Sequence, residues 1–208
     1  MKRVFSLMLL ALLLPLGALA NSVDFTNWKG TLSAGTAGLS LTGSSLIAIN
    51  GPTGMITGDL GSLAFSTGAL TGGSLQMGGA FAAGGSFVIA GNGTKGIPNG
   101  VLFSGSFSGP LTWELVILAD GTHNYALTGA ITGTWFTGQT VNGASVQLTV
   151  NTGHGFFNGP VTLSSGDTNL TGNAVKFIAA PEPSSMLLFG TGILGYRGTL
   201  AREREVEQ

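Results

Sequence analysis

Two histidines, His123 and His154, are the only imidazole groups in a chain of 208 residues that has no cysteine. Nucleophilic hydrolysis needs a serine or threonine beside a base and an orienting acid, so one of these histidines would have to be that base. His123 lies in a stretch with the pattern of a β-strand, and His154 lies between two glycines in a predicted loop. No Gly-x-Ser-x-Gly turn precedes a helix. The sequence therefore predicts no catalytic residues.

Metal ligands are equally sparse. His123 and His154 lack the short helical spacing of a zinc-binding pair. The runs "DGTHN" from Asp120 and "GDTN" from Gly166 offer oxygen atoms, but neither has the carboxylate density of a calcium loop, and turn chemistry is the favoured interpretation. The few acidic residues show no pairing of the glycosidase kind. We expect no metal site, no cofactor and no enzymatic activity, with a secreted hydrolase of unrecognised site as the third alternative.

Aromatic side chains offer a different kind of chemistry, because flat rings can stack on sugars while hydroxyl and amide groups bind sugar hydroxyls. Three rings are candidate carbohydrate contacts: Trp28, Tyr125 and Trp135. Trp113 has the inward phase of its predicted strand, which favours a place in the core. Core packing is the alternative for the other three rings as well.

Composition narrows the possible partners. Only 8% of the residues are charged, against about 25% in typical soluble proteins. Residues 21–180 contain no arginine, which argues against binding of nucleic acid. A surface built from serine, threonine and asparagine repels its neighbours little, so association and adhesion are favoured. Without cysteine, the fold depends on its core alone.

The first twenty residues have the parts of an export signal. Lys2 and Arg3 precede an apolar run, and Ala18-Leu19-Ala20 fits a signal peptidase site. The apolar run before Pro15 is short for a membrane span of about 30 Å. We expect a signal helix over residues 1–20, cleaved after Ala20 by signal peptidase.

The other end of the chain carries a second apolar segment. Pro181, Glu182 and Pro183 form an extended strip, since proline disfavours both helix and sheet pairing. An apolar span follows at about residues 185–200 and leads to a basic tail. By the positive-inside rule, three arginines keep that tail in the cytoplasm: Arg197, Arg202 and Arg204.

This order of motif, span and basic end resembles the PEP-CTERM sorting segment of Gram-negative bacteria, over residues 181–208 only. The resemblance implies transient anchoring in the inner membrane by a C-terminal hydrophobic helix. It also implies cleavage near the Pro-Glu-Pro motif by a membrane-embedded exosortase, followed by delivery to the cell surface or the extracellular space.

Between the two ends, residues 21–180 are predicted to form one secreted domain. Six Asn-Gly or Asp-Gly pairs favour tight turns; they start at Asn50, Asn92, Asn99, Asp120, Asn142 and Asn158. The clearest hairpin turns at Asp120-Gly121. One face of its two strands is predicted to carry Leu111, Trp113, Leu115 and Ile117, then His123, Tyr125 and Leu127. Further strands are predicted at 101–107, with Val101, Phe103 and Phe107 on the inward face, and at 143–150, with Val146, Leu148 and Val150 inward. A last strand is predicted from Ala174.

The first half of the domain is rich in glycine, serine and threonine, and ordered strands with glycine bulges are favoured over disorder. The predicted fold is all-β, a glycine-rich antiparallel sandwich or jelly-roll-like single domain flanked by the two helices. The predicted role is that of an exported structural or adhesive protein associated with exopolysaccharide, an association implied by the family. A carbohydrate-binding module is the alternative, marked by two or more exposed aromatic rings on a concave face.

Overall fold

The computed structural model describes residues 22–52 and 54–171. These residues form strands joined by turns, so the prediction of an antiparallel all-β fold is confirmed. The strands are β1 (Ser22–Trp28), β2 (Thr31–Gly35), β3 (Gly38–Gly51), β4 (Gly54–Ser66), β5 (Leu70–Ser74), β6 (Gly78–Phe81), β7 (Gly84–Asn92), β8 (Asn99–Phe107), β9 (Leu111–Ile117), β10 (His123–Trp135), β11 (Thr140–Asn151), β12 (Val161–Thr162) and β13 (Ser165–Thr171). The signal helix, the strand predicted from Ala174 and the C-terminal helix lie outside the described residues.

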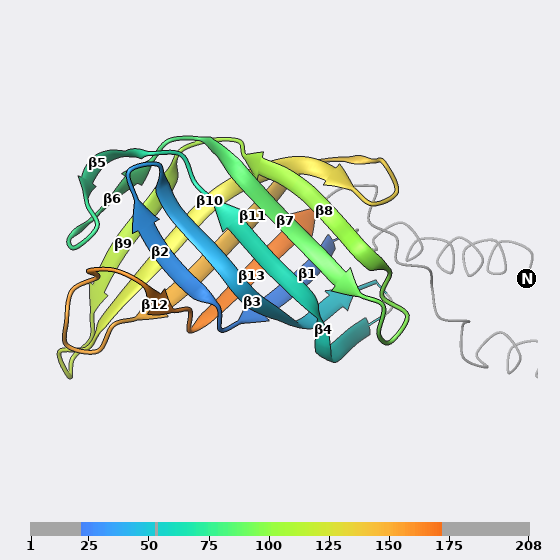
Figure 1. Ribbon diagram of the computed structural model, residues 1–208, viewed down its shortest axis with the longest axis horizontal. Coiled ribbons are helices and arrows are strands. Elements are labelled where there is room, and N and C mark those ends of the chain that lie inside the picture. Colours follow the sequence, from blue (N-terminus) through green and yellow to red (C-terminus); the bar gives the residue numbers. More distant parts are fainter. Residues whose placement is uncertain (1–21, 53, 172–208) are drawn as a thin grey trace, which may run out of the picture. The chain divides into compact units, whose positions relative to one another are not determined.

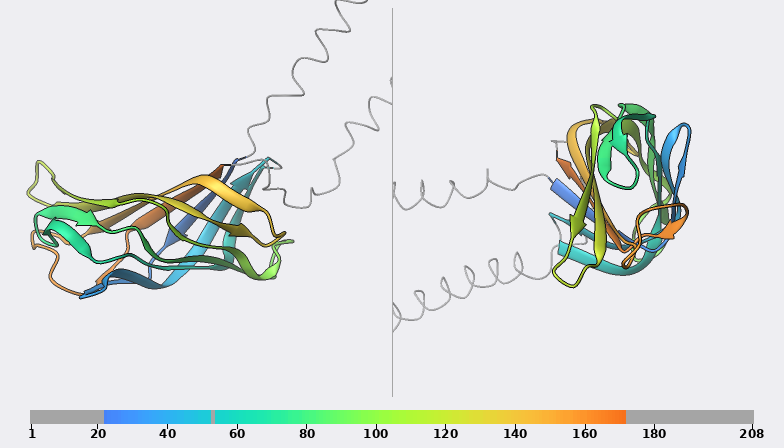
Figure 2. Two further views of the ribbon diagram at one scale, coloured as in Figure 1. Left: turned by 90° about the horizontal axis from the view of Figure 1, so that it is seen from above. Right: turned by 90° about the vertical axis from the view of Figure 1, so that its left-hand side faces the viewer.

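The sheet closes on itself. Eight strands follow one another around the wall in the order β1, β3, β4, β7, β8, β10, β11 and β13, and β13 pairs with β1 again. Figures 1 and 2 show the resulting barrel, with β5, β6 and β9 extending from one side and β2 and β12 from another. A closed barrel thus takes the place of the sandwich or jelly roll that turn spacing suggested.

Two long strands join the extensions to this wall. β3 pairs along one edge first with β2 and then with β1, and β10 pairs along one edge first with β9 and then with β8. One part of each long strand therefore pairs with a strand of the barrel wall, β1 or β8. The other part pairs with a strand outside the wall, β2 or β9. Turn signals in the sequence are the same for a barrel and a sandwich, so they could not separate the two.

The glycine-rich first half is ordered and bulged, as predicted. The β3–β4 pairing shifts register between Leu41 and Ser44, where Gly43 has a φ of 66°. A bulge also explains a wrong detail in β8, where Val101 was predicted to point inward. The β7–β8 register shifts beside it, so Leu102 and Phe103 are both buried while Val101 is exposed. The predicted turn at Asn142-Gly143 is likewise a bulge inside β11.

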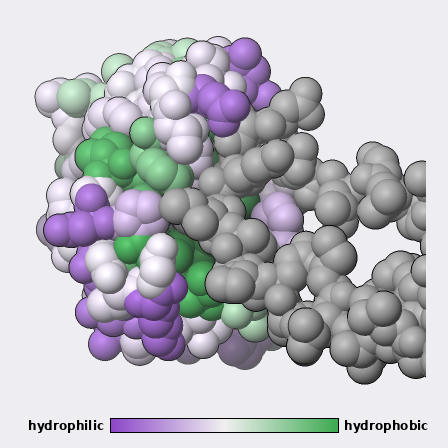
Figure 3. All heavy atoms as spheres, turned by 90° about the vertical axis from the view of Figure 1, so that its right-hand side faces the viewer, coloured by the Kyte–Doolittle hydropathy of each residue, from purple (hydrophilic) through white to green (hydrophobic). Residues whose placement is uncertain are grey.

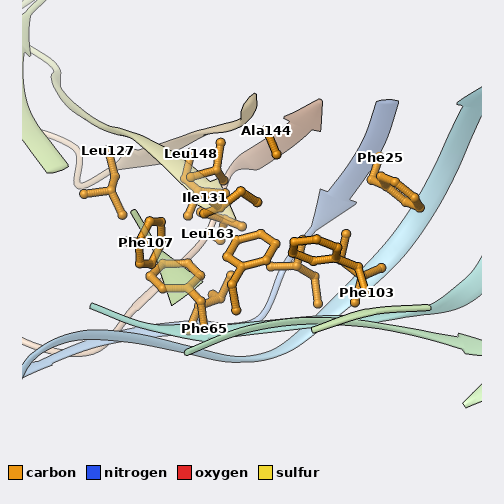
Figure 4. Close-up of a cluster of buried hydrophobic side chains, with 14 of the residues drawn as sticks. Phe25, Phe65, Phe103, Phe107, Leu127, Ile131, Ala144, Leu148 and Leu163 are labelled. Atoms are coloured by element: carbon orange, nitrogen blue, oxygen red, sulfur yellow. The ribbon is translucent and has the colours of Figure 1, made fainter. Parts of the chain in front are cut away.

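Phenylalanine rings fill the barrel beside β4, β7 and β8. Phe107 meets Phe65 and Phe87 edge to face, with both pairs of ring centroids 5.8 Å apart. Phe87 also meets Phe103 edge to face at 6.3 Å. Figure 4 shows several of these rings pointing toward aliphatic side chains of the opposite wall, such as Ile131 and Leu148. The interior is thus a packed core that holds the wall rigid.

Close backbone contact supports the wall where β8 meets β10. Gly105 and Gly133 are register partners, and a Cβ atom on Gly105 would lie 2.1 Å from the carbonyl oxygen of Thr132. Glycine at this place allows the two strands to approach.

Candidate functional site

A shallow groove of about 590 Å³ lies on the outer surface of four neighbouring strands, β10, β11, β13 and β1. Most of its lining residues are uncharged and polar and two are carboxylates, but apolar atoms form most of the surface that they expose in the groove. The residues that line it are Asp24, Thr128, Gly129, Ala130, Ser145, Val146, Gln147, Asp167, Thr168 and Asn169. It therefore combines hydrogen-bonding groups with apolar surface on a rigid support.

Strand alternation places most of these side chains on the outside, whereas those of Val146 and Thr168 are buried. On β1 the buried positions are Val23, Phe25 and Asn27, so Asp24 and Thr26 face outward. On β11 the apolar side chains of Val146 and Leu148 are buried, as predicted, and Gln147 between them is exposed. The same apolar core that holds the barrel together thus sets which polar groups line the groove.

Hydrogen bonds hold both carboxylates of the groove. Thr26 Oγ1 donates to Asp167 Oδ1 at 2.9 Å, and Asn169 Nδ2 donates to Asp24 Oδ1. The β1–β13 register places Asp24 opposite Asn169 and Thr26 opposite Asp167. The acceptors are therefore oriented before any ligand arrives, which reduces the entropy lost on binding.

Of the three predicted sugar-contacting rings, Trp28 alone is exposed on the surface. Trp28 lies two residues after Thr26 on β1, so both side chains point outward. The Trp28 side chain is 46% exposed, and Lys29 Nζ lies 4.3 Å from the centroid of its ring. Trp135 is buried, with its ring centroid 5.9 Å from that of Phe25. The prediction of a surface role for Trp135 is therefore wrong, because its strand phase points into the barrel.

Tyr125 is also a core residue, which corrects the prediction that it contacts carbohydrate. Its ring stacks on Trp113 with centroids 4.9 Å apart, and Phe157 meets Trp113 edge to face. The Tyr125 hydroxyl donates to the carbonyl of Gln76 at 2.7 Å and accepts from the N–H of Phe157 at 3.1 Å. The hydroxyl is satisfied by backbone groups, so the ring is fixed inside this end of the barrel.

The two histidines lie in different environments. His123 is buried, its Nδ1 lies 3.1 Å from the carbonyl oxygen of Gly155, and its ring is 4.8 Å from that of Phe156. His154 is exposed, and within the described residues it makes no hydrogen bond to a carboxylate or a hydroxyl. The structure thus brings neither histidine together with the partners that hydrolysis requires.

The two acidic turn candidates have different outcomes. Thr122 N donates to Asp120 Oδ1 at 2.9 Å, which confirms turn chemistry in "DGTHN". This backbone bond, with a smaller contribution from the Thr122 side chain, holds the pKa of Asp120 below its ordinary value of 3.8. "GDTN" instead lies in β13. Sequence reasoning missed this strand because two of its inward positions are Gly166 and Thr168, which give no apolar alternation.

Two general features of the described residues concern metal ions and membranes. No cluster of three or more histidine, cysteine, aspartate or glutamate side chains there is arranged to hold a metal ion. Residues 22–52 and 54–171 also include no helix of the length and hydropathy needed to span a membrane.

Comparison with known proteins gives a result for the C-terminal segment. No curated protein and no solved structure matches the chain. Residues 179–204 match the PEP-CTERM protein-sorting motif, which includes Pro181, Glu182, Pro183 and the three arginines of the tail; all of them lie outside the described residues. This motif implies export, transient anchoring in a membrane and processing by exosortase, a membrane enzyme. C-terminal to the β-barrel in its sequence, the chain therefore carries a PEP-CTERM sorting motif of the kind found in exosortase-sorted extracellular proteins.

Proposed function

We propose that the barrel is a non-enzymatic adhesive component of the cell surface or extracellular matrix, which binds exopolysaccharide through the outer groove. Sorting would carry it across the inner membrane of a Gram-negative cell and release it after C-terminal cleavage. The observation that carries the proposal is the groove itself, with its oriented carboxylates and amides on four strands of a closed barrel.

The chemistry of the groove suits a sugar polymer. Carboxylate oxygens accept hydrogen bonds, and amide groups both donate and accept, so Asp24, Gln147 and Asp167 match the alternating donors and acceptors of sugar hydroxyls. The groove is shallow and open, as a long chain requires, whereas small substrates are held in pockets that enclose most of their surface. Its rigid strands add no ordering cost on binding.

A dedicated carbohydrate-binding module is the second candidate, and Trp28 favours it. The ring shares the outward face of β1 with Asp24, which lines the groove, and with Thr26, which donates a hydrogen bond to the lining residue Asp167. A sugar chain that extends from the groove along β1 would reach this ring, which could stack on the apolar face of a pyranose. The two candidates differ in one respect: a dedicated carbohydrate-binding module would need the Trp28 ring for binding, and the adhesive component would not.

Retention in the matrix tests the adhesive function. The chain with Asp24→Ala, Gln147→Ala and Asp167→Ala is expressed in its host, and its distribution between exopolysaccharide and medium is measured. We expect retention to fall about tenfold, as the loss of roughly 1.4 kcal/mol of binding free energy predicts. The matched control is Ser104→Ala, on the outer face of β8. Equal retention of the triple variant and the wild type would overturn the proposal. A comparable loss in Trp28→Ala alone would favour the dedicated module.

Sorting has its own test, which is independent of polysaccharide binding. The intact mass and the C-terminus of the protein are measured in hosts with and without exosortase. We expect the tail after Pro183 to be lost only when exosortase is present and the Pro-Glu-Pro motif is intact. Retention of the whole tail in both hosts would contradict the proposed processing.

A further inference from the structure

The outer groove runs across the strands and not along them. Val146 of β11, in the middle of its floor, pairs in register with Gly129 of β10 on one side and with Thr168 of β13 on the other. The side chains of Val146 and Thr168 are buried in the barrel, so these residues present their backbone to the groove. Because register partners face each other across the strands, the floor crosses three strands roughly at right angles.

Two rows of outward side chains border this floor, and in each row the neighbours are register partners. The first row consists, in strand order, of Asp24, Asn169, Ser145 and Ala130. The second row consists of Asp167, Gln147 and Thr128. The two rows are two residues apart along each strand, which is about 7 Å, and each step along a row is a strand spacing of about 4.8 Å.

The second row continues beyond the groove on both sides. Thr26 of β1 is the register partner of Asp167, and Thr112 of β9 is the register partner of Thr128. Both threonines have the outward phase of their strands, and Thr26 Oγ1 donates to Asp167 Oδ1 at 2.9 Å. Hydrogen-bonding side chains therefore face outward in one row from β1, over β13, β11 and β10, to β9.

Along the strands the polar surface is shorter. Ser22 and Thr171, two residues beyond Asp24 and Asn169, end the described parts of β1 and β13. Apolar residues are exposed at this end of the barrel (Figures 1 and 3). A polymer laid along the strands in this direction would soon pass onto apolar surface, whereas a polymer laid across them keeps hydrogen-bond partners as far as β9.

The groove has an apolar floor between polar rows. Apolar atoms form most of the surface exposed in it, while the rows carry carboxylate, amide and hydroxyl groups. A pyranose ring with equatorial hydroxyls has the matching arrangement, because C–H groups form its faces and hydroxyls form its edges. β-Linkages keep such a polymer extended, so that successive sugars advance by a distance close to the strand spacing. An α-linked chain coils and would leave the rows.

The groove also offers no cation to an acidic polymer. Asp24 and Asp167 line it, and none of the lining residues is a lysine, arginine or histidine. Both lysines of the described residues are engaged elsewhere, since Lys29 Nζ lies over a tryptophan ring and Lys95 Nζ donates to a main-chain carbonyl. A uronate sugar in the groove would therefore place like charges side by side.

We propose that the polysaccharide bound in the groove is a neutral, β-linked glycan with equatorial hydroxyls, which lies across the strands between the two rows. This inference rests on the proposed binding of exopolysaccharide by the groove and names the class of sugar. The C–H faces of the rings pack on the floor, and the edge hydroxyls donate to Asp24 and Asp167. Acidic polymers are excluded by charge and α-linked polymers by shape. This course does not lead to Trp28, which lies further along β1.

Three hexasaccharides test the class of sugar. Cellohexaose is neutral and β-linked, its counterpart oxidised to glucuronate has the same linkage with a carboxylate on every sugar, and maltohexaose has the same sugars with α-linkages. The full chain is expressed in its host, and dissociation constants of the exported protein are measured by calorimetry in buffer free of divalent cations. We expect cellohexaose to bind at least about fivefold more tightly than either of the others.

The double variant Asp24→Asn, Asp167→Asn tests the role of charge. Both substitutions keep an acceptor oxygen and remove the negative charge. We expect the preference for cellohexaose over the glucuronate to fall to less than about twofold, because the like charges are gone. The preference over maltohexaose should remain, since the shape of the groove is unchanged.

Two threonine variants test the direction of the glycan. Thr112 continues the second row across to β9, whereas Thr149 lies two residues beyond Gln147 along β11, and both face outward. Thr112→Ala and Thr149→Ala are matched, because each removes one hydroxyl from the outer surface. We expect Thr112→Ala to weaken cellohexaose binding about fivefold and Thr149→Ala to leave it unchanged.

The outcomes separate this inference from the proposed function. Wild-type binding of the glucuronate or of maltohexaose as tight as that of cellohexaose, or an equal loss in the two threonine variants, would overturn the inference and leave polysaccharide binding in place. Absence of binding to all three hexasaccharides would overturn the inference as well. The proposed function would fail with it only if the triple variant Asp24→Ala, Gln147→Ala and Asp167→Ala is retained in the matrix like the wild type.

Discussion

Along β8 the inward and outward side chains belong to two different surfaces. Phe103 and Phe107 point into the barrel and meet the rings of the phenylalanine cluster, whereas Ser104, between them in the sequence, is exposed. The same contrast recurs on β11, where Leu148 is buried and Gln147 lines the groove. One strand thus supplies stability on one face and binding chemistry on the other.

This contrast teaches how a chain with few charges and no disulfide remains folded and still presents a functional surface. Apolar burial is the main stabilising term, and it is confined to inward positions. Outward positions carry small polar groups, which leaves them free to change with little effect on folding. Substitutions on the two faces should therefore differ in what they alter.

The largest expected effect is on the inner face. Phe103→Ala removes a ring that packs against Phe87, and the wall cannot collapse into the space because its strands are fixed in a closed sheet. We expect a loss of about 3–5 kcal/mol in the free energy of unfolding. Guanidinium unfolding of the exported protein, followed by tryptophan fluorescence, measures it. Ser104→Ala, the neighbouring outward position, should change stability by no more than about 0.5 kcal/mol. Similar losses in both variants would show that stability does not depend mainly on the inward face of β8.

An intermediate effect is expected where the wall itself is tight. The methyl group of Gly105→Ala would lie 2.1 Å from the Thr132 carbonyl oxygen, so β8 and β10 must separate. We expect a loss of about 1–3 kcal/mol. Gly109 follows β8 and has open space around its Cα, and Gly109→Ala should be neutral or slightly stabilising. The same unfolding measurement compares the two, and a neutral Gly105→Ala would refute the close approach of these strands.

Local pattern made part of this fold predictable. The hairpin around Asp120-Gly121 was predicted from alternation and turn chemistry. Leu111, Trp113 and Leu127 are buried as expected, whereas Ile117, predicted on the same face, is exposed because it lies at the end of β9 next to the turn. Closure of the barrel was not predictable, because it depends on β13 pairing with β1, which lies more than a hundred residues away in the sequence. No local signal records which distant edge a strand will meet.

The groove shows a second limit of sequence reasoning. Asp24 and Asp167 are more than a hundred residues apart, and the β1–β13 register alone brings them to one surface. The aromatic rings were easier to notice but mostly misleading, since Tyr125 and Trp135 have inward strand phases. Trp28 could be assigned to the surface because its neighbours Val23 and Phe25 on β1 mark the buried phase.

The smallest expected effect belongs to the turn that joins β9 to β10, outside both faces. Because the N–H of Thr122 lowers the pKa of Asp120, the carboxylate is bound more favourably in the folded state than in the unfolded chain. Its contribution is therefore complete above the ordinary value of 3.8 and is lost as the pH falls through the lower folded value. Asp120→Asn keeps an acceptor for Thr122 but cannot titrate. We expect the wild type to be slightly more stable than the variant above about pH 5, with the difference vanishing below pH 3.8. Unfolding midpoints measured across this range test the sign, and a difference that grows as the pH falls would contradict it.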